Sequence, residues 1–273
     1  MKKWTYRILI VLFLGIFLCS AGALAWYFLD SRAQEGRYEE LAQLKPSIPH
    51  TLPTLPGGDV LPETQPEDPY ITVEDPATGE TAEILPGFAQ LYNLNSDIIG
   101  WLTIPGVEVD YPVMHTPQEP QYYLRRNFDK KRQTRGCLFL DGAADPFRPS
   151  EVLTVYGHKM RDGTMFGKLD RYKEESFWQD NRYIYFDTLK DSRVYEIIGV
   201  FQTSVSVEES FSYHLYADCS RQAFEEYVAK VKDLCMYDTG ITAQYGDQLL
   251  TLSTCDKTIA DGRFVVVAKR VGN

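Results

Sequence analysis

The sequence predicts a mainly β domain with added helices, preceded by an apolar segment and a linker. Short runs rich in β-branched and aromatic residues recur through the C-terminal two thirds, which is typical of a barrel or a sandwich. Helical patterns interrupt them at residues 164–178 and 221–234. With 273 residues, the chain can bury one sizeable core. The expected strands cover residues 97–112, 136–140, 152–156, 183–186, 193–203, 248–254 and 264–271.

Residues 8–29 carry no charged side chain and are long enough to cross a membrane as a helix. Basic residues precede this run, so the positive-inside tendency predicts a cytoplasmic tail at residues 1–7 and an extracellular location for the rest. A cleaved signal peptide is the alternative, supported by small residues at positions 21, 22, 23 and 25. The apolar run, however, exceeds the roughly 7 to 15 residues of a usual signal core.

Residues 30–86 are expected to form a juxtamembrane stalk and an extended linker. Residues 32–45 have helical spacing with mixed charges, which suits a stalk. From residue 46 to residue 86 prolines recur and large apolar residues are sparse. The folded domain is therefore expected to occupy residues 87–273, and a short amphipathic helix over residues 88–94 is expected at its start.

The net charge and the cysteine and histidine spacing argue against nucleic acid and metal ions as ligands. The formal net charge of −10 disfavours a nucleic-acid partner, because phosphate binding depends on clustered Lys and Arg side chains. Neither CxxC nor HExxH spacing occurs, so we expect no metal and no other cofactor. The acidity itself identifies no substrate, since most of the carboxylates are expected on a solvated surface.

The pattern near the C-terminus singles out Cys255 as a reactive thiol. In the predicted strand 248–254 the leucines face one way, whereas Ser253 and the following Cys255 face the other. A core cysteine would be expected among the apolar residues. Its place on the polar face, at the end of a strand, favours an exposed and reactive thiol over an incidental one.

A cation is expected opposite this thiol. A short loop at residues 256–262 separates the cysteine strand from the last strand, and strands joined in this way are usually antiparallel neighbours. Arg263 therefore starts opposite Cys255, at a backbone separation of about 5 Å. A lone Arg at a strand end is ordinarily solvated, but here it can stabilise an oxyanion bound beside the sulfur.

A thiol nucleophile also needs a base, and the sequence contains four histidines. His50 lies in the linker and His214 in a polar loop, whereas His158 ends a predicted strand beside a glycine. We expect His158 to be the base, with a tight Asp-Gly turn at residues 162–163 holding the next loop near the strand end. His115, which ends another strand-like run, remains an alternative base when spacing alone is considered.

These residues lie in motifs that resemble those of a sortase, and specifically of a class B sortase. The motifs are NSDIIGWLTIPGVEVDYPV, TVYGHKMRDGTMFGKL around His158, and TLSTC followed by RFVVVAK. The resemblance runs from about residue 88 to the C-terminus. It implies a sortase-type closed β-barrel with an N-terminal helix and a helix inserted before the cysteine strand.

The resemblance also implies a cysteine transpeptidase of the cell membrane, anchored by one N-terminal helix. Cys255 would be the nucleophile, His158 the general acid and base, and Arg263 the residue that stabilises the substrate carbonyl or the tetrahedral oxyanion. The enzyme would cleave the C-terminal sorting signal of a secreted protein through a thioester. An amine of a peptidoglycan cross-bridge or stem peptide would then attack the thioester and become joined to the protein.

Three positions are expected to contact the substrate by the same resemblance, namely Ser253, Thr254 and Leu124. The Asn often found shortly before that Leu is Pro120 in this chain. The NPQTN-like signal of some class B members therefore does not transfer simply.

Other functions use the same features in part. A hydrolytic thiol peptidase would need the same residues and differ only in its acceptor, and a pilin-polymerising sortase is a further alternative. A membrane-tethered adhesin or scaffold would bind a partner without chemistry, so replacing Cys255 by Ala would leave it functional. The motif context of all three catalytic residue types favours the transpeptidase.

Overall fold

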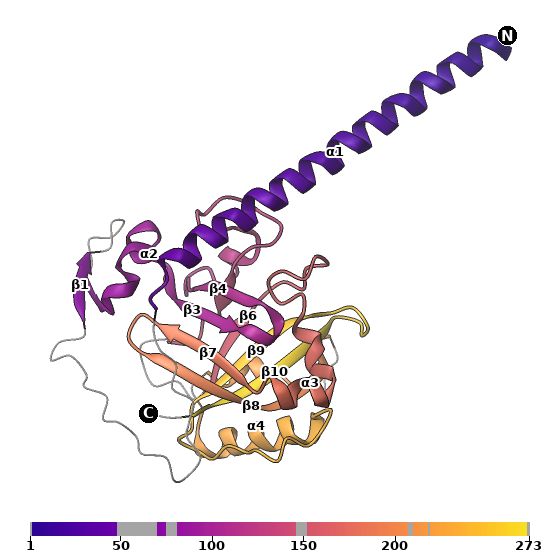
Figure 1. Ribbon diagram of the computed structural model, residues 1–273. Helices are drawn as coiled ribbons and strands as arrows, with labels where there is room; N and C mark the ends of the chain where they lie inside the picture. Colours follow the sequence, from indigo (N-terminus) through magenta and orange to yellow (C-terminus); the bar gives the residue numbers. More distant parts are fainter. Residues whose placement is uncertain are drawn as a thin grey trace. The chain divides into compact units, whose positions relative to one another are not determined.

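The computed structural model describes residues 2–47, 70–74, 81–145, 152–206, 210–217 and 219–271. The chain divides into two compact units, Met1–Leu44 and Lys45–Asn273 (Figure 1). Most of the predicted linker, with His50, lies outside the described residues.

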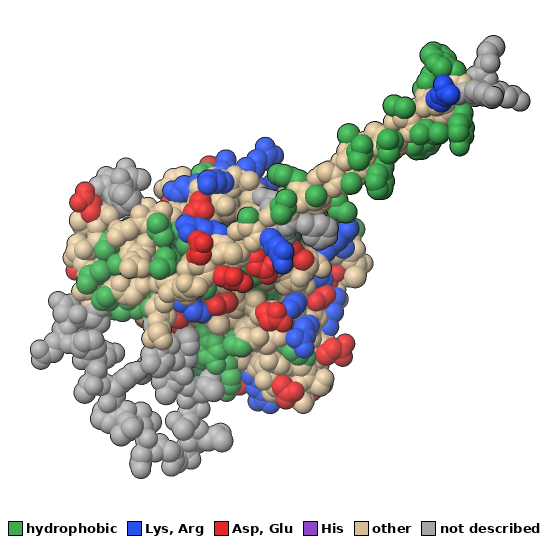
Figure 2. Space-filling view, turned by 45° about the horizontal axis from the view of Figure 1, so that its top comes forward, with side chains coloured by type: hydrophobic (Ala, Val, Ile, Leu, Met, Phe, Trp, Pro, Cys, Tyr) green, Lys and Arg blue, Asp and Glu red, His purple; other side chains and the backbone are tan. Residues whose placement is uncertain are grey.

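The first unit is one continuous helix, α1 (Lys2–Leu44). Its stretch Trp4–Trp26 has a mean hydropathy of 2.7 and is long enough to cross a membrane. Exposed hydrophobic side chains cover this stretch (Figure 2). The sequence predicted a membrane helix over residues 8–29 followed by a juxtamembrane stalk; the helix continues into that stalk as far as Leu44, and the first proline of the chain, Pro46, comes directly after Lys45.

A small hairpin lies within the segment that the sequence predicted to be an extended linker. The strands β1 (Ile71–Glu74) and β2 (Thr81–Ile84) pair antiparallel, with Ile71 opposite Ile84. Val73 and Ile84 are buried, so the hairpin packs through its apolar side chains. Residues 71–74 do alternate between apolar and polar side chains, but the surrounding prolines led the sequence analysis to assign the whole segment to a linker.

Eight strands close into a barrel, which confirms the predicted mainly β architecture with added helices (Figure 1). Their order around the barrel is β10-β8-β7-β3-β4-β5-β6-β9. The pairs β4–β5 and β6–β9 are parallel, and the other neighbours are antiparallel. The strands are β3 (Ile98–Ile104), β4 (Val109–Met114), β5 (Leu138–Leu140), β6 (Val152–Tyr156), β7 (Tyr183–Thr188), β8 (Ser192–Ser204), β9 (Leu249–Asp256) and β10 (Gly262–Val271).

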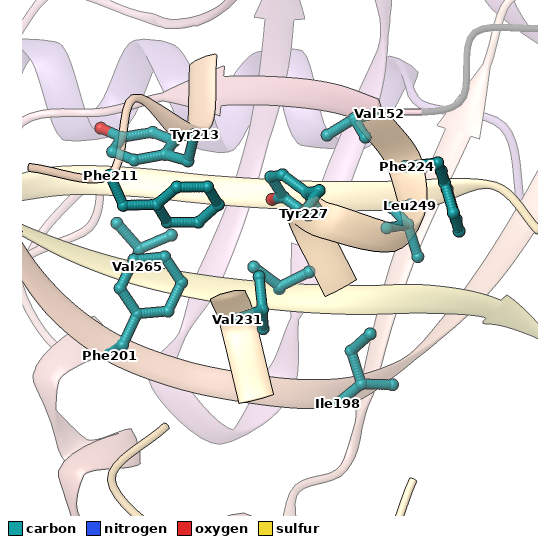
Figure 3. Packing of buried hydrophobic residues seen from close by; sticks show 11 residues of the cluster. Val152, Ile198, Phe201, Phe211, Tyr213, Phe224, Tyr227, Val231, Leu249 and Val265 are labelled. Carbon is teal, nitrogen blue, oxygen red and sulfur yellow. The ribbon is translucent and has the colours of Figure 1, made fainter. Parts of the chain in front are cut away.

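The helix α4 (Arg221–Leu234) covers the outer face of the barrel beside β8 (Figure 1). The side chain of Ser220 caps its first turn by accepting a hydrogen bond from Ala223. Figure 3 shows Tyr227 and Val231 of this helix packed towards Val265 of β10. The predicted helix and its apolar face are thus confirmed, and both faces of the neighbouring strands are buried.

The predicted helix over residues 164–178 is wrong. The chain there makes turns, then the 3₁₀ segment η4 (Leu169–Lys173) and the short helix α3 (Glu175–Asp180). Met165 has a φ of 54°, in the left-handed region, and this backbone conformation is incompatible with an α-helix. The remaining short elements are α2 (Ala89–Leu94), which confirms the predicted helix, η1 (Pro86–Phe88), η2 (Pro105–Val107), η3 (Tyr122–Arg125) and η5 (Tyr213–Leu215).

Candidate active site

Cys255 lies near the end of β9 and is the one exposed residue of that strand. Thr251 and Ser253 share its side of the strand, but tyrosines cover them. The Tyr227 hydroxyl lies 2.7 Å from that of Thr251, and the Tyr213 hydroxyl lies 2.6 Å from that of Ser253. The polar side of β9 is therefore sealed along its length and opens to solvent at the thiol.

Arg263 lies directly opposite Cys255 in the antiparallel pair β9–β10, as the sequence predicted. Its guanidinium donates to the backbone carbonyl of Gly262 at 2.9 Å. A second, longer contact of 3.4 Å reaches the carbonyl of Asp261. Carbonyls of the connecting loop thus hold the cation at the start of its strand, beside the thiol.

The parallel pairing of β6 and β9 brings His158 to the same end of the barrel as Cys255. Tyr156, the last residue of β6, is opposite Ser253 of β9. His158 and Cys255 each follow this pair by two residues on neighbouring segments. The candidate base and the candidate nucleophile are therefore adjacent in the fold although far apart in the sequence.

Contacts of Gly157 continue this pairing beyond the end of β6. Its amide donates to the carbonyl of Ser253 at 3.1 Å, and its carbonyl accepts from the Thr254 hydroxyl at 2.8 Å. A Cβ added at Gly157 would lie 2.5 Å from Leu138 and 2.6 Å from Phe166, so the position requires glycine. These contacts hold the backbone just before His158 against the backbone just before Cys255.

The imidazole of His158 has a defined proton position. Its Nε2 lies 2.8 Å from the backbone carbonyl of Leu124, and because a carbonyl can only accept, Nε2 carries the hydrogen. Nδ1 is then the nitrogen that can take up a proton. Burial lowers the pKa of His158 below its usual 6.5, opposed by the bond to Leu124 and aided by the charge of Arg125. The ring is therefore neutral at pH 7, as a general base must be.

The other histidines are placed differently. His115 follows β4, which runs parallel to β5, and β5 runs antiparallel to β6. The C-terminal ends of β4 and β6 therefore face opposite ends of the barrel, which favours His158 over His115 as the base. His214 lies on η5, next to Tyr213.

The predicted substrate contacts have structural partners of their own. Ser253 and Thr254 are buried, and their hydroxyls bond to Tyr213 and Gly157. Leu124 lies half-buried on η3, with its carbonyl bonded to His158. A substrate contact by any of these three residues stays a prediction.

Sequence reasoning missed Tyr213 and Asp256. Burial raises the pKa of Tyr213, and the hydrogen bond with Ser253 and the positive charge of Arg263 act in the opposite direction. No periodic pattern marks the aromatic residues around this tyrosine. Asp256 directly follows Cys255, which was a signal that could have been used. Among the described residues, no group of three or more His, Cys, Asp or Glu side chains could hold a metal ion.

Comparison with known proteins identifies the family. The model of the sortase domain matches residues 102–271. Sortase B of Listeria monocytogenes is 29% identical over 203 residues, which cover 73% of this chain and 80% of the relative. Sortase B of Staphylococcus aureus is 25% identical over 189 residues, which cover 68% and 75%.

Solved structures agree with this assignment. A sortase B from Bacillus anthracis has a TM-score of 0.67 at 27% identity, covering 90% of this chain and 100% of its own. Sortase B of Clostridium perfringens has a TM-score of 0.62 at 29% identity, covering 67% and 98%. Because sequence relatives, structural relatives and the domain model all converge on the same enzymes, the chain belongs to the sortase family of cysteine transpeptidases, and within it to class B.

Proposed function

We propose that this protein cleaves the C-terminal sorting signal of secreted proteins and transfers them to an amine of a cell-wall peptide. The observation that supports this most directly is the parallel pairing of β6 and β9, because His158 and Cys255 each follow the pair Tyr156–Ser253 by two residues. Arg263, opposite the thiol in the next strand, adds a permanent cation.

In the first step, Sγ of Cys255 bonds to the carbonyl carbon of a threonine in the signal. His158 takes the thiol proton at Nδ1, and Arg263 stabilises the negative charge that develops on the carbonyl oxygen. The bond from the carbonyl carbon to the next nitrogen then breaks, and His158 donates the proton to this leaving amine. The products are a thioester on Cys255 and a free C-terminal fragment.

In the second step, an amine of a peptidoglycan cross-bridge or stem peptide attacks the thioester carbon. His158 accepts a proton from this amine and returns it to the sulfur as the carbon–sulfur bond breaks. A new peptide bond results, and the thiol is regenerated. Water in place of the amine would give hydrolysis, which is the reaction of a thiol peptidase.

The location that we propose is the cell membrane, with the catalytic unit outside. The apolar part of α1, Trp4–Trp26, supports a single anchor. The basic residues at positions 1–7 favour a cytoplasmic N-terminus. This orientation brings the enzyme to the side of the membrane where its substrates and its acceptor amine occur.

Mass spectrometry of the full chain in detergent tests this function. The protein would be incubated with peptides of the LPxTG and NPxTN types, with and without a cross-bridge or stem-peptide amine. We expect a thioester on Cys255 that the amine converts into ligated peptide. Cys255→Ala should abolish it, whereas Cys219→Ala, a matched change at another cysteine of the catalytic unit, should not. Cleavage without ligation would indicate a hydrolase, and intact peptides with a reactive thiol would contradict the proposal.

A further inference from the structure

Two ion pairs connect the residues that directly follow the proposed base and the proposed nucleophile. Lys159 Nζ lies 2.7 Å from Asp170 Oδ2, and Lys173 Nζ lies 3.2 Å from Asp256 Oδ2. Asp170 and Lys173 belong to the same 3₁₀ segment, η4. One short element therefore holds both chain segments that carry the proposed chemistry.

On the nucleophile side, the anchor is a fully buried carboxylate. The Asp256 side chain is 0% exposed and points away from Cys255, because successive side chains of a strand alternate. Its oxygens accept hydrogen bonds from the backbone and the hydroxyl of Thr258, at 2.9 and 2.6 Å, from Lys173, and from the amide of Gln202. Burial acts to raise the pKa of Asp256, but these donors outweigh it and hold the pKa well below its usual range.

On the base side, the loop after His158 folds back on itself and is held to η4 by an ion pair. The amide of Phe166 donates to the carbonyl of His158 at 3.0 Å, and Lys159 forms an isolated β-bridge with Met165. Asp162 accepts hydrogen bonds from the backbone and the hydroxyl of Thr164. The Lys159–Asp170 pair then ties this closed loop to η4.

The 3₁₀ segment itself is fixed to the protein core. Leu169 and Tyr172 are buried. The Tyr172 hydroxyl donates to the carbonyl of Asn181 at 2.9 Å, and the Tyr237 hydroxyl donates to the carbonyl of Tyr172 at 2.8 Å. The segment can therefore act as a rigid support for both ion pairs.

We propose that η4 is a positioning element that sets the geometry between His158 and Cys255, through one ion pair on each side. The inference rests on the proposed function, since it concerns the same two reacting residues. Lys173 and Asp170 act through their partners and are positioning residues.

The two ion pairs should contribute unequally. Loss of Lys173 leaves the buried carboxylate of Asp256 without its cation, whereas Lys159 and Asp170 are 24% and 37% exposed and are partly solvated. A misplacement of reacting groups by about 1 Å can cost on the order of 100-fold in rate. We therefore expect Lys173→Met to slow thioester formation about 10-fold to 100-fold at saturating peptide, and Asp170→Asn about 3-fold to 10-fold.

The test uses the full chain in detergent and single-turnover formation of the thioester. The KM for the peptide should change less than about twofold in Lys173→Met, and Lys173→Arg should recover most of the rate because it keeps the cation. Lys168→Met is the matched control, since Lys168 pairs with Glu108, between β3 and β4, at 2.6 Å. This variant should retain the wild-type rate.

A double-mutant cycle separates positioning from general stability. If η4 aligns the base, adding His158→Ala to Lys173→Met should cost far less than His158→Ala costs in the wild type. A full His158 penalty in the Lys173→Met background, or an equal loss in Lys168→Met, would overturn the inference. Should Lys173→Met fold poorly, the same cycle with Asp170→Asn decides the question. Absence of a thioester in the wild type would instead contradict the proposed function.

Discussion

The two halves of the candidate active site are positioned in different ways. Cys255 and Arg263 lie on one hairpin, so a short loop and antiparallel pairing are sufficient to bring them together. His158 reaches the thiol through the parallel pairing of β6 and β9, and parallel neighbours cannot be joined by a tight turn. One half therefore depends on local sequence, and the other depends on closure of the barrel.

The largest effect is expected from removing the base. His158→Ala should lower the rate of thioester formation about 10²-fold to 10⁴-fold, because no group then takes the thiol proton in the transition state. Rapid-quench measurement with saturating peptide would give this rate. The matched control is His115→Ala, directly after β4, which should leave the rate unchanged. A similar loss in both variants would mean that the base has been misassigned.

Removing Arg263, which belongs to the same hairpin as Cys255, should lower the rate somewhat less than removing the base. Arg263→Ala should lower kcat about 10²-fold to 10³-fold, since it removes the charge that stabilises the oxyanion. Arg263→Lys should recover only part of this loss, because an ammonium lacks the planar, two-pronged donor geometry of guanidinium. Steady-state kinetics of peptide cleavage would measure both variants. Wild-type kcat in Arg263→Ala would contradict the assigned role.

A smaller effect is expected from removing the hydrogen bond between the cysteine strand and the segment that carries His158. Thr254→Val removes the hydroxyl that bonds to Gly157, which should lower the free energy of unfolding by about 1–3 kcal/mol. It should also slow thioester formation several-fold, because the backbone before the base is released. Thr239→Val removes a comparable bond, at 2.9 Å to the carbonyl of Ile198, away from the site. Denaturant titration and single-turnover rates should show lost stability in both variants but a lost rate only in Thr254→Val.

The smallest effect is a pH dependence of stability. Because burial lowers the pKa of folded His158 below 6.5, the unfolded chain binds the proton more tightly. The free energy of unfolding should therefore fall as pH decreases below about 6.5. His158→Gln should flatten part of this slope, and the remainder is expected from His115, whose pKa burial also lowers. Denaturant titrations between pH 8 and pH 5 would measure the slope, and an unchanged slope in His158→Gln would contradict a buried neutral ring.

The features that sequence predicted best are those set by local pattern. The barrel strands and α4 follow from strand and helix periodicity, and the place of Arg263 opposite Cys255 follows from a short loop. The wrong prediction of a helix at residues 164–178 has a physical cause. An apolar pattern does not reveal the left-handed backbone conformation at Met165. The turn there depends on contacts that close only in the folded protein.

The features that sequence could not supply are non-local. Alternation placed Ser253 correctly on the side of Cys255, but it could not show that Tyr213 covers this hydroxyl. The choice between His158 and His115 likewise required strand order, which fixes the end of the barrel that the strand before each histidine faces. The bond from His158 to the carbonyl of Leu124 leaves no trace in residue types, because any residue offers a carbonyl.

The most direct test of the central claim is the intact mass of the protein after brief incubation with a cleavable sorting peptide, compared between the wild type and His158→Ala. We expect the wild type to gain the mass of the N-terminal peptide fragment on Cys255, as an adduct that hydroxylamine removes. His158→Ala should show almost none at the same time point. An adduct that forms equally fast in both proteins, or on another cysteine, would contradict the claim that closure of the barrel assembles the base and the nucleophile.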